Sequence, residues 1–259
     1  MRAALFGGIY SNHLALAEAL ADARRRGADA LYCLGDVGAF GPHPDRSIEL
    51  LRSASVRMVQ GNYDEAVGNA RDDCGCGYTD PRDNHYARIS YGYTLEHTAL
   101  EHRPWLAGLP PRLEFEAGGR RHVLVHGSPR QQNEFLWEST SPDAFLERLC
   151  LDARADVLLC THTGLHWQRR LPSGRRVVNV GALGRPANDG RRCVWYALLD
   201  TEDRTSPVRF VPVEYDVDSL AREMREERLP EEFVETILTG WWTTCLEILP
   251  SRERSRGRF

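Results

Sequence analysis

The stretch LFGGIYSNHLAL, residues 5–16, decides the fold of this 259-residue chain. The apolar run 2–6 stops at two glycines, which is typical of a buried strand that ends in a tight loop. Residues 13–26 then carry Leu and Ala at helical spacing and stop before Gly27. The loop between them has Gly8 and Tyr10 where ligand-bearing side chains are expected. The loop has therefore either lost its catalytic side chains or never had them.

The next segments repeat this pattern. A strand over 30–34 ends at the dipeptide GD, a helix covers 44–52, and a strand over 56–60 ends at GN. Strands and helices that alternate with short joins predict right-handed crossovers and a largely parallel sheet.

The second half of the chain predicts a second sheet packed on the first within one α/β domain. Segments 112–116 and 121–125 flank the turn AGG and indicate a hairpin. Further strands are expected over residues 156–160, 176–180, 193–199 and 208–213.

Two segments fall outside the sheets. Residues 69–84 are rich in Gly, Asp and Pro, and this composition predicts an irregular segment that covers a functional site as a lid. Residues from 218 onward look helical, with Trp241 and Trp242 packing back, and the charged tail SRERSRGRF is expected to be mobile. We therefore expect a domain over 1–215 and, over 216–259, a C-terminal helical extension packed on it.

Composition limits the function classes. The chain has 33 basic and 37 acidic residues and a net charge of -4, which argues against general nucleic-acid binding. No apolar run reaches membrane-spanning length, and the N-terminus lacks the features of a signal peptide, so we expect a cytoplasmic protein. The cysteines are odd in number and scattered, which does not indicate a disulfide framework: Cys33, Cys74, Cys76, Cys150, Cys160, Cys193 and Cys245.

Polar side chains follow five of the expected strands. The loops read GGIYSN (7–12), GDVGAFGP (35–42), GNYD (61–64), HGSPR (126–130) and CTHTGLHW (160–167). The carboxyl ends of neighbouring strands form the usual ligand crevice of an α/β sheet. We therefore expect Asp36, Asn62, His126 and His162 to meet there, and their oxygen and imidazole ligands suit a divalent Zn, Mn or Fe ion.

The order of these loops resembles the calcineurin-like metallophosphoesterases, whose motifs run D-x-H, GD, GNHD, a lone His before Gly, and GHTH. The resemblance spans about residues 2–200. It implies a four-layer αββα sandwich, two mixed β-sheets flanked by helices, and hydrolysis of a phosphoester at two metal ions that share a bridging Asp.

Carried over by position, the resemblance is complete for one ion only. Asp36 stands at the bridging carboxylate, Asn62 at the amide ligand, His126 at the lone His and His162 at the first His of GHTH. The other ion loses its ligands, because Gly8, Tyr10 and Gly164 replace an Asp and two His. Random decay would not confine the losses to one side, so this pattern favours a mononuclear site with one half-site altered.

Other residues are candidates for compensating roles. Tyr63, which replaces the assisting His of GNHD, and Tyr10 are candidate catalytic hydrogen-bond donors, or they simply fill the vacated space. Arg82 and Arg130 could supply the missing positive charge, and a loop slip could bring in His166 as a ligand.

Three further features stay open. Cys74 and Cys76 are possible replacement ligands or incidental thiols of a glycine-rich loop. Arg130 and Asn133 could contact substrate, or belong to an ordinary loop that enters a helix. Arg185 could bind an anion in the loop NVGALGRPANDG, 179–190, or sit in a structural turn.

The sequence thus predicts a metal-dependent hydrolase acting on a small phosphoester, with phosphate or a small phosphorylated molecule as its partner. One alternative is a non-catalytic binding or scaffold protein on the same fold, and another is iron or redox chemistry at a Tyr- and Cys-lined site.

Overall fold

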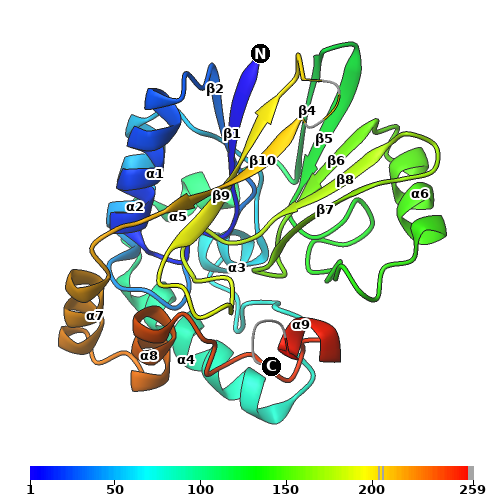
Figure 1. The fold of residues 1–259 in the computed structure, drawn as a ribbon. Coiled ribbons are helices and arrows are strands. Elements are labelled where there is room, and N and C mark those ends of the chain that lie inside the picture. Colours follow the sequence, from blue (N-terminus) through cyan, green and yellow to red (C-terminus); the bar gives the residue numbers. More distant parts are fainter. Residues whose placement is uncertain (204, 206, 256–259) are drawn as a thin grey trace.

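Two five-stranded sheets form the centre of the computed structural model, which describes residues 1–203, 205 and 207–255 (Figure 1). The first sheet has the order β10-β9-β1-β2-β3 and the second β4-β5-β6-β8-β7. Both are mixed, which confirms the predicted pair of packed mixed sheets.

The first sheet is built around β1 (Arg2–Phe6), which pairs in parallel with β2 (Ala30–Cys33). The short β3 (Arg57–Met58) continues the parallel part, and it covers only two of the five predicted residues. On the other side of β1, β9 (Val194–Asp200) and β10 (Val208–Val213) run antiparallel to their neighbours.

The second sheet contains the predicted hairpin of β4 (Arg112–Ala117) and β5 (Arg120–Val125). Strands β5, β6 (Val157–Cys160) and β8 (Arg176–Val180) are mutually parallel neighbours. The edge strand β7 (His166–Arg170), which the sequence did not predict, pairs antiparallel with β8.

Apolar side chains fill the space between the sheets. This core includes Leu5, Leu34, Leu124, Leu159 and Val180, all of which are fully buried. Helices α1 (His13–Arg25) and α2 (Pro44–Ser53) lie beside the first sheet, and α6 (Asp143–Asp152) lies beside the second (Figure 1). The layers are therefore helices, sheet, sheet and helix.

Four helices escaped sequence prediction: α3 (Asn62–Gly68), α4 (Pro81–His97), α5 (Arg103–Ala107) and α6. Helix α4 begins inside the segment expected to be a lid. Its start was encoded locally, because Asp80 caps the Arg82 and Asp83 N–H groups and Pro81 occupies the first turn.

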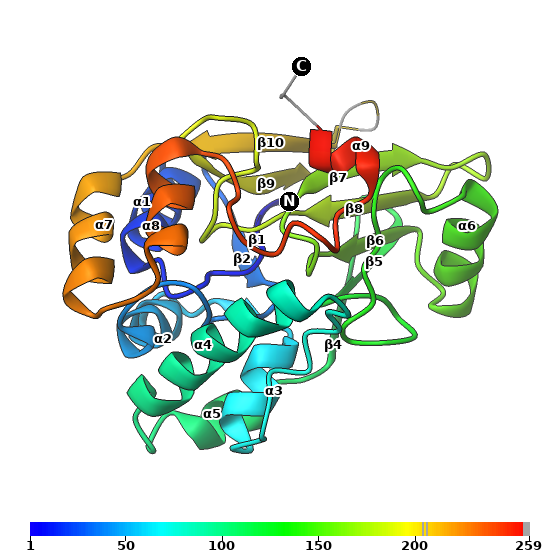
Figure 2. The same ribbon diagram turned by 90° about the horizontal axis from the view of Figure 1, so that it is seen from below.

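The C-terminal extension is helical as expected, with α7 (Val217–Glu226), α8 (Glu231–Thr239) and α9 (Ser251–Ser255). Residues 240–250, here called the C-terminal strap, join α8 to α9 across the end of the sheets (Figure 2). Within the tail that was expected to be mobile, the Glu253 carboxylate is buried and accepts hydrogen bonds from Ser139 N–H and Oγ. Residues 256–259 lie outside the described part.

Among the described helices, none combines the length and the apolar character needed to cross a membrane.

Gly7 provides a test of how closely the two sheets meet. A Cβ atom there would lie 1.6 Å from the Gly181 carbonyl oxygen, so Gly7→Ala forces the end of β1 away from the loop after β8. We expect a loss of about 3 kcal/mol or more in the free energy of unfolding, measured with urea. The matched control is Gly92→Ala in α4, where a Cβ meets no atom within 4 Å. That substitution should stabilise the protein by about 0.5–1 kcal/mol. Equal effects of the two changes would contradict this account of the packing.

Candidate functional site

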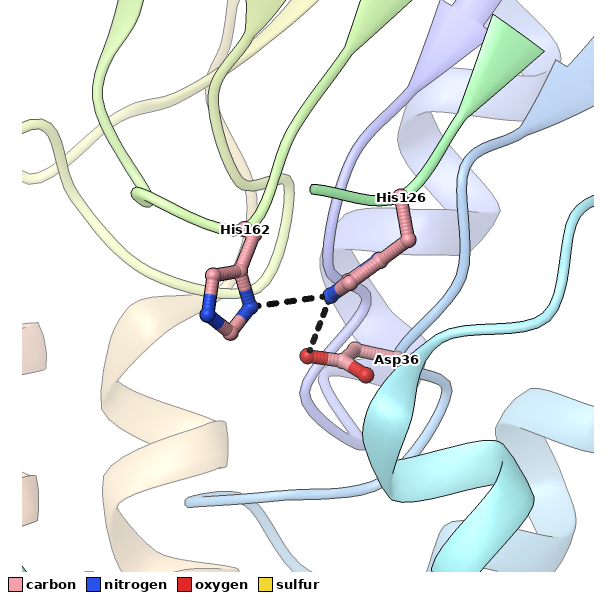
Figure 3. A group of neighbouring side chains, drawn as sticks. All are labelled: Asp36, His126 and His162. Carbon is pink, nitrogen blue, oxygen red and sulfur yellow. Dashed lines mark hydrogen bonds and ion pairs between the residues drawn. The ribbon is translucent and has the colours of Figure 1, made fainter. Parts of the chain in front are cut away.

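Three buried side chains converge at the carboxyl ends of the strands, each from a loop identified in the sequence. Asp36 follows β2, His126 follows β5 and His162 follows β6. His126 Nε2 lies 3.3 Å from Asp36 Oδ2 and 3.1 Å from His162 Nδ1 (Figure 3). One ligand atom from each residue lies within 4.8 Å of the others, a spacing that suits a single metal ion.

The ligand atoms of this trio are oriented by their surroundings. His126 Nδ1 is 2.6 Å from the Leu34 carbonyl oxygen, so Nδ1 carries the proton and Nε2 presents its lone pair to the other ligands. Asp36 Oδ1 accepts the Tyr63 N–H at 3.0 Å, which directs Oδ2 toward His126. The His162 ring packs on Phe135, with ring centroids 4.3 Å apart.

Asn62, the fourth predicted ligand, begins α3 and is also buried. Its Nδ2 donates to the Cys74 carbonyl oxygen at 2.8 Å and lies 3.5 Å from Cys76 Sγ. Its Oδ1 is buried and has no hydrogen-bond partner within the described residues. A buried amide oxygen without a partner is costly, and a metal ion would remove that cost, so this donor set fits the predicted cation.

Asp64 has a role that the sequence analysis missed, although it is the last residue of the quoted GNYD motif. Its buried carboxylate accepts the backbone N–H groups of Asp36, Val37 and Gly61 at 2.8–2.9 Å. These bonds join the loop after β2 to the loop after β3. Burial and then the neighbouring Asp36 raise the pKa of Asp64 to about 6, against the effect of the three donors.

Burial and charge set the protonation of the trio. Burial would raise the pKa of Asp36, but the charge and hydrogen bond of His126 outweigh it and lower that pKa. Burial would lower the pKa of His126, but the charge and hydrogen bond of Asp36 outweigh burial and raise that pKa. For His162, burial and then the charge of His126 lower the pKa to about 3, so its imidazole is neutral at pH 7 and able to bind a metal.

Aromatic rings lie next to Gly8 and Gly164, the positions where the resemblance would have two ligands of a second ion. A Cβ at Gly8 would lie 2.4 Å from Tyr10 Cε1, so the Tyr10 ring covers the position of the missing Asp side chain. A Cβ at Gly164 would lie 2.9 Å from Trp242 Cη2, so the strap covers the position of a missing His. Tyr63 is engaged elsewhere, because its hydroxyl donates to Ser90 Oγ on α4 at 3.0 Å.

Arg185 lies beside these rings and is fully enclosed. Its guanidinium carbon is 3.9 Å from the Trp242 ring centroid and 4.8 Å from that of Phe40, and its Nη2 donates to the Thr244 carbonyl oxygen at 2.6 Å. Within the described residues, no carboxylate lies within 4.0 Å of it. Burial raises the pKa of Tyr10 and Asp36 raises it further, whereas Arg185 lowers it, so the Tyr10 hydroxyl lies within the fields of both charges.

An open cavity of about 540 Å³ adjoins the site. It is lined by Asn62 and Cys74, by other residues of the segment 65–75, and by Gln131, Gln132 and Asn133. The segment expected to be a lid and the loop after His126 therefore share the wall of this cavity, with Asn133 in it. Asn133 Nδ2 also donates to the Gly75 carbonyl oxygen at 2.7 Å.

The structure does not bring the remaining candidates to the trio. Arg82 binds the Thr243 carbonyl oxygen, and Arg130 pairs with Glu134 on the surface. The His166 ring packs between Trp195 and Phe210. Contrary to the expectation of unpaired thiols, Cys74 and Cys76 are joined by a disulfide, and a disulfide sulfur lacks the thiolate charge that binds metals.

Comparison with known proteins places this geometry in context. The family model of the calcineurin-like phosphoesterase superfamily domain matches residues 1–204. The uncharacterized protein MJ0912 of Methanocaldococcus jannaschii is 26% identical over 251 residues, which cover 92% of this chain and 97% of that protein.

Two solved structures are similar over nearly the whole chain. The hypothetical protein PH1004 from Pyrococcus horikoshii OT3 has a TM-score of 0.78 and 24% identity, covering 93% of this chain and 99% of that one. A metallophosphoesterase from Sphaerobacter thermophilus has a TM-score of 0.70 and 28% identity, with the same two coverages.

The neutral state of His162 predicts acid sensitivity of the metal-free protein. The folded pKa of about 3 lies below the unfolded value near 6.5, so this stabilising contribution is present above pH 6.5 and is lost as the pH falls toward 3. Between pH 7 and pH 5 we expect the free energy of unfolding to drop by about 2 kcal/mol from this residue, measured with urea in the presence of a chelator. His162→Asn should show a smaller drop, and Asn tolerates the positive φ of 69° at this position. Identical pH dependence in both proteins would refute the assignment.

Proposed function

The chain belongs to the calcineurin-like phosphoesterase superfamily, and we propose that it hydrolyses a small phosphoester with one divalent metal ion held by Asp36, Asn62, His126 and His162. The observation that carries this proposal is the convergence of three ligand atoms within 4.8 Å, next to the unpartnered Asn62 Oδ1. Zn, Mn and Fe ions all accept this mixture of oxygen and imidazole ligands.

When bound, such an ion would polarise a phosphoryl oxygen and lower the pKa of a coordinated water. The protein's own contribution is to keep the ligand lone pairs free and aimed at one point. The Leu34 carbonyl oxygen holds the proton on His126 Nδ1, and burial keeps His162 neutral. The Tyr63 backbone N–H orients Asp36, which is the role we assign to Tyr63 in place of proton transfer through its hydroxyl.

We further propose that the site is mononuclear and that Arg185 supplies the positive charge that a second ion would otherwise provide. The Tyr10 and Trp242 rings fill the positions of missing ligands, and Arg185 lies on Trp242 without a carboxylate partner among the described residues. A buried guanidinium is suited to a phosphate group and to the charge that develops on it. The Tyr10 hydroxyl stays protonated because burial raises its pKa, so it serves as a hydrogen-bond donor.

The cavity next to Asn62 suits a small substrate. Its volume of about 540 Å³ is in the range of small-molecule pockets, and its wall carries the amides of Gln131, Gln132 and Asn133. The rival of iron chemistry at tyrosinate gains no support, since burial raises the pKa values of Tyr10 and Tyr63. Cytoplasmic location and the lack of general nucleic-acid binding stay predictions.

The first test is the metal content of protein purified without chelator or added metal. We expect about one metal ion per chain, and loss of that ion in the Asp36→Ala, His126→Ala double variant. Hydrolysis of p-nitrophenyl phosphate or its bis ester in the presence of Zn, Mn or Fe should fall by at least about 1,000-fold in the same variant. Asp152→Asn, on the exposed α6, is the control and should match the unmodified protein. Two ions per chain would overturn the mononuclear assignment. A single bound ion without hydrolysis of any phosphoester would favour the scaffold alternative.

Arg185 gives a second test. Arg185→Gln keeps hydrogen-bonding capacity but removes the charge, and we expect kcat/KM to fall by about 100-fold with the metal content unchanged. The melting temperature and Trp fluorescence check that the packing on Trp242 persists. Arg148→Gln, on the surface of α6, is the matched control. Unchanged kcat/KM in a folded Arg185→Gln protein would remove Arg185 from the site.

A further inference from the structure

We propose that the Cys74–Cys76 pair is a redox-controlled part of the metal site: the disulfide withholds a ligand, and reduction releases Cys76 as a thiolate ligand to the same ion. This inference rests on the proposed metal site and adds to it a sulfur ligand and a dependence on redox state. Three independent features of the structure support it.

The first feature is contact with a ligand. Cys76 Sγ lies 3.5 Å from Asn62 Nδ2, and the Cys74 carbonyl oxygen accepts a hydrogen bond from the same amide at 2.8 Å. The pair therefore lies against Asn62, one of the four proposed ligands, and Cys76 contributes the sulfur of this contact.

The second feature is that hydrogen bonds hold this loop independently of the disulfide. Asn133 Nδ2 donates to the Gly75 carbonyl oxygen at 2.7 Å, and the Gly75 N–H donates to Asp73 Oδ1 at 2.7 Å. The bond from Asn62 to Cys74 adds a third anchor. Breaking the S–S bond leaves all three in place, so both sulfurs stay beside the site.

The third feature is access for a reductant. Cys74 lines the open cavity of about 540 Å³ and, with Cys76, a second cavity of about 240 Å³. Gly75 between them is exposed. The two cysteines are themselves largely buried, at 6% exposure for Cys74 and 8% for Cys76. The other cysteines of the described residues are unbridged.

The chemistry balances with a dithiol as reductant. The dithiol transfers two electrons and two protons to the pair, its two thiols become a disulfide, and Cys74 and Cys76 become thiols. The Cys76 thiol then loses its proton when it binds the ion. A thiolate changes the donor set from oxygen and nitrogen to one that includes sulfur, which favours Zn²⁺ over Mn²⁺.

Cobalt(II) provides the direct readout, because a thiolate ligand gives a sulfur-to-metal charge-transfer band in the near ultraviolet. Apo protein is either reduced with dithiothreitol, which is then removed anaerobically, or oxidised with glutathione disulfide, and each sample is titrated with Co²⁺. Thiol counts by mass spectrometry after alkylation confirm the state of the pair. We expect the band at one Co²⁺ per chain in the reduced protein only. Zn²⁺ should bind the reduced form at least about tenfold more tightly.

Single-cysteine variants identify the ligand. Cys74→Ser cannot form the disulfide and should show the band without reduction, whereas Cys76→Ser should lack it in every state. Cys193→Ser, which removes a half-buried free cysteine elsewhere, is the control and should behave as the unmodified protein. A band that persists in reduced Cys76→Ser, or equal Zn²⁺ affinity in both redox states of the unmodified protein, would overturn the inference.

The outcomes also separate this inference from the proposed function. One Co²⁺ bound without the band in either redox state leaves the mononuclear site intact and refutes the role of Cys76. The absence of bound Co²⁺ and Zn²⁺ in both states refutes the metal site itself and, with it, this inference.

Discussion

The buried carboxylate of Asp64 is the constraint on which the rest of the site depends. It takes the N–H groups of Asp36 and Val37 from one loop and that of Gly61 from the next, so a single side chain replaces the missing sheet partners of two strand ends. Asp36 has a left-handed backbone with φ 60°, a conformation that needs such external support. With Asp36 held in place, its carboxylate can reach His126 and so bring the two sheets' loops to one point.

The convergence of Asp36, His126 and His162 could be predicted from the sequence, whereas much of their surroundings could not. Asp36, His126 and His162 each follow a buried strand, and parallel strands bring their carboxyl ends together whatever the intervening loops do. Helix α4 was missed because its buried side chains include Ser90 and Thr94 and give no clear apolar stripe. The cap at Asp80 and Pro81 was a local signal that the glycine-rich composition of the preceding residues obscured. The neighbours of Arg82, Arg130 and His166 are set by long-range packing, which spacing in a sequence does not encode.

In the mononuclear site that we propose, parts of the chain would stand where the family pattern has a second metal ion. A metal ion arrives from solution and its occupancy follows its concentration, whereas the Arg185 guanidinium is always present and always charged. Its burial without a carboxylate is unfavourable by desolvation, and the Trp242 and Phe40 rings together with the Thr244 carbonyl oxygen offset part of that cost. The remaining desolvation cost lowers the stability of the folded protein, and the phosphate group that we propose as a ligand of Arg185 would offset it.

The C-terminal strap is synthesised after the sheets and the proposed metal ligands, although it forms part of the wall beside Arg185. Both sheets and all four proposed ligands lie before residue 215, so a nascent chain can form the metal-binding part while the strap is still inside the ribosome. Trp242 and Thr244, which enclose Arg185, emerge after all of these residues. During translation the Arg185 side chain therefore stays uncovered until the strap has been made, so the proposed metal ligands can fold before this part of the wall closes.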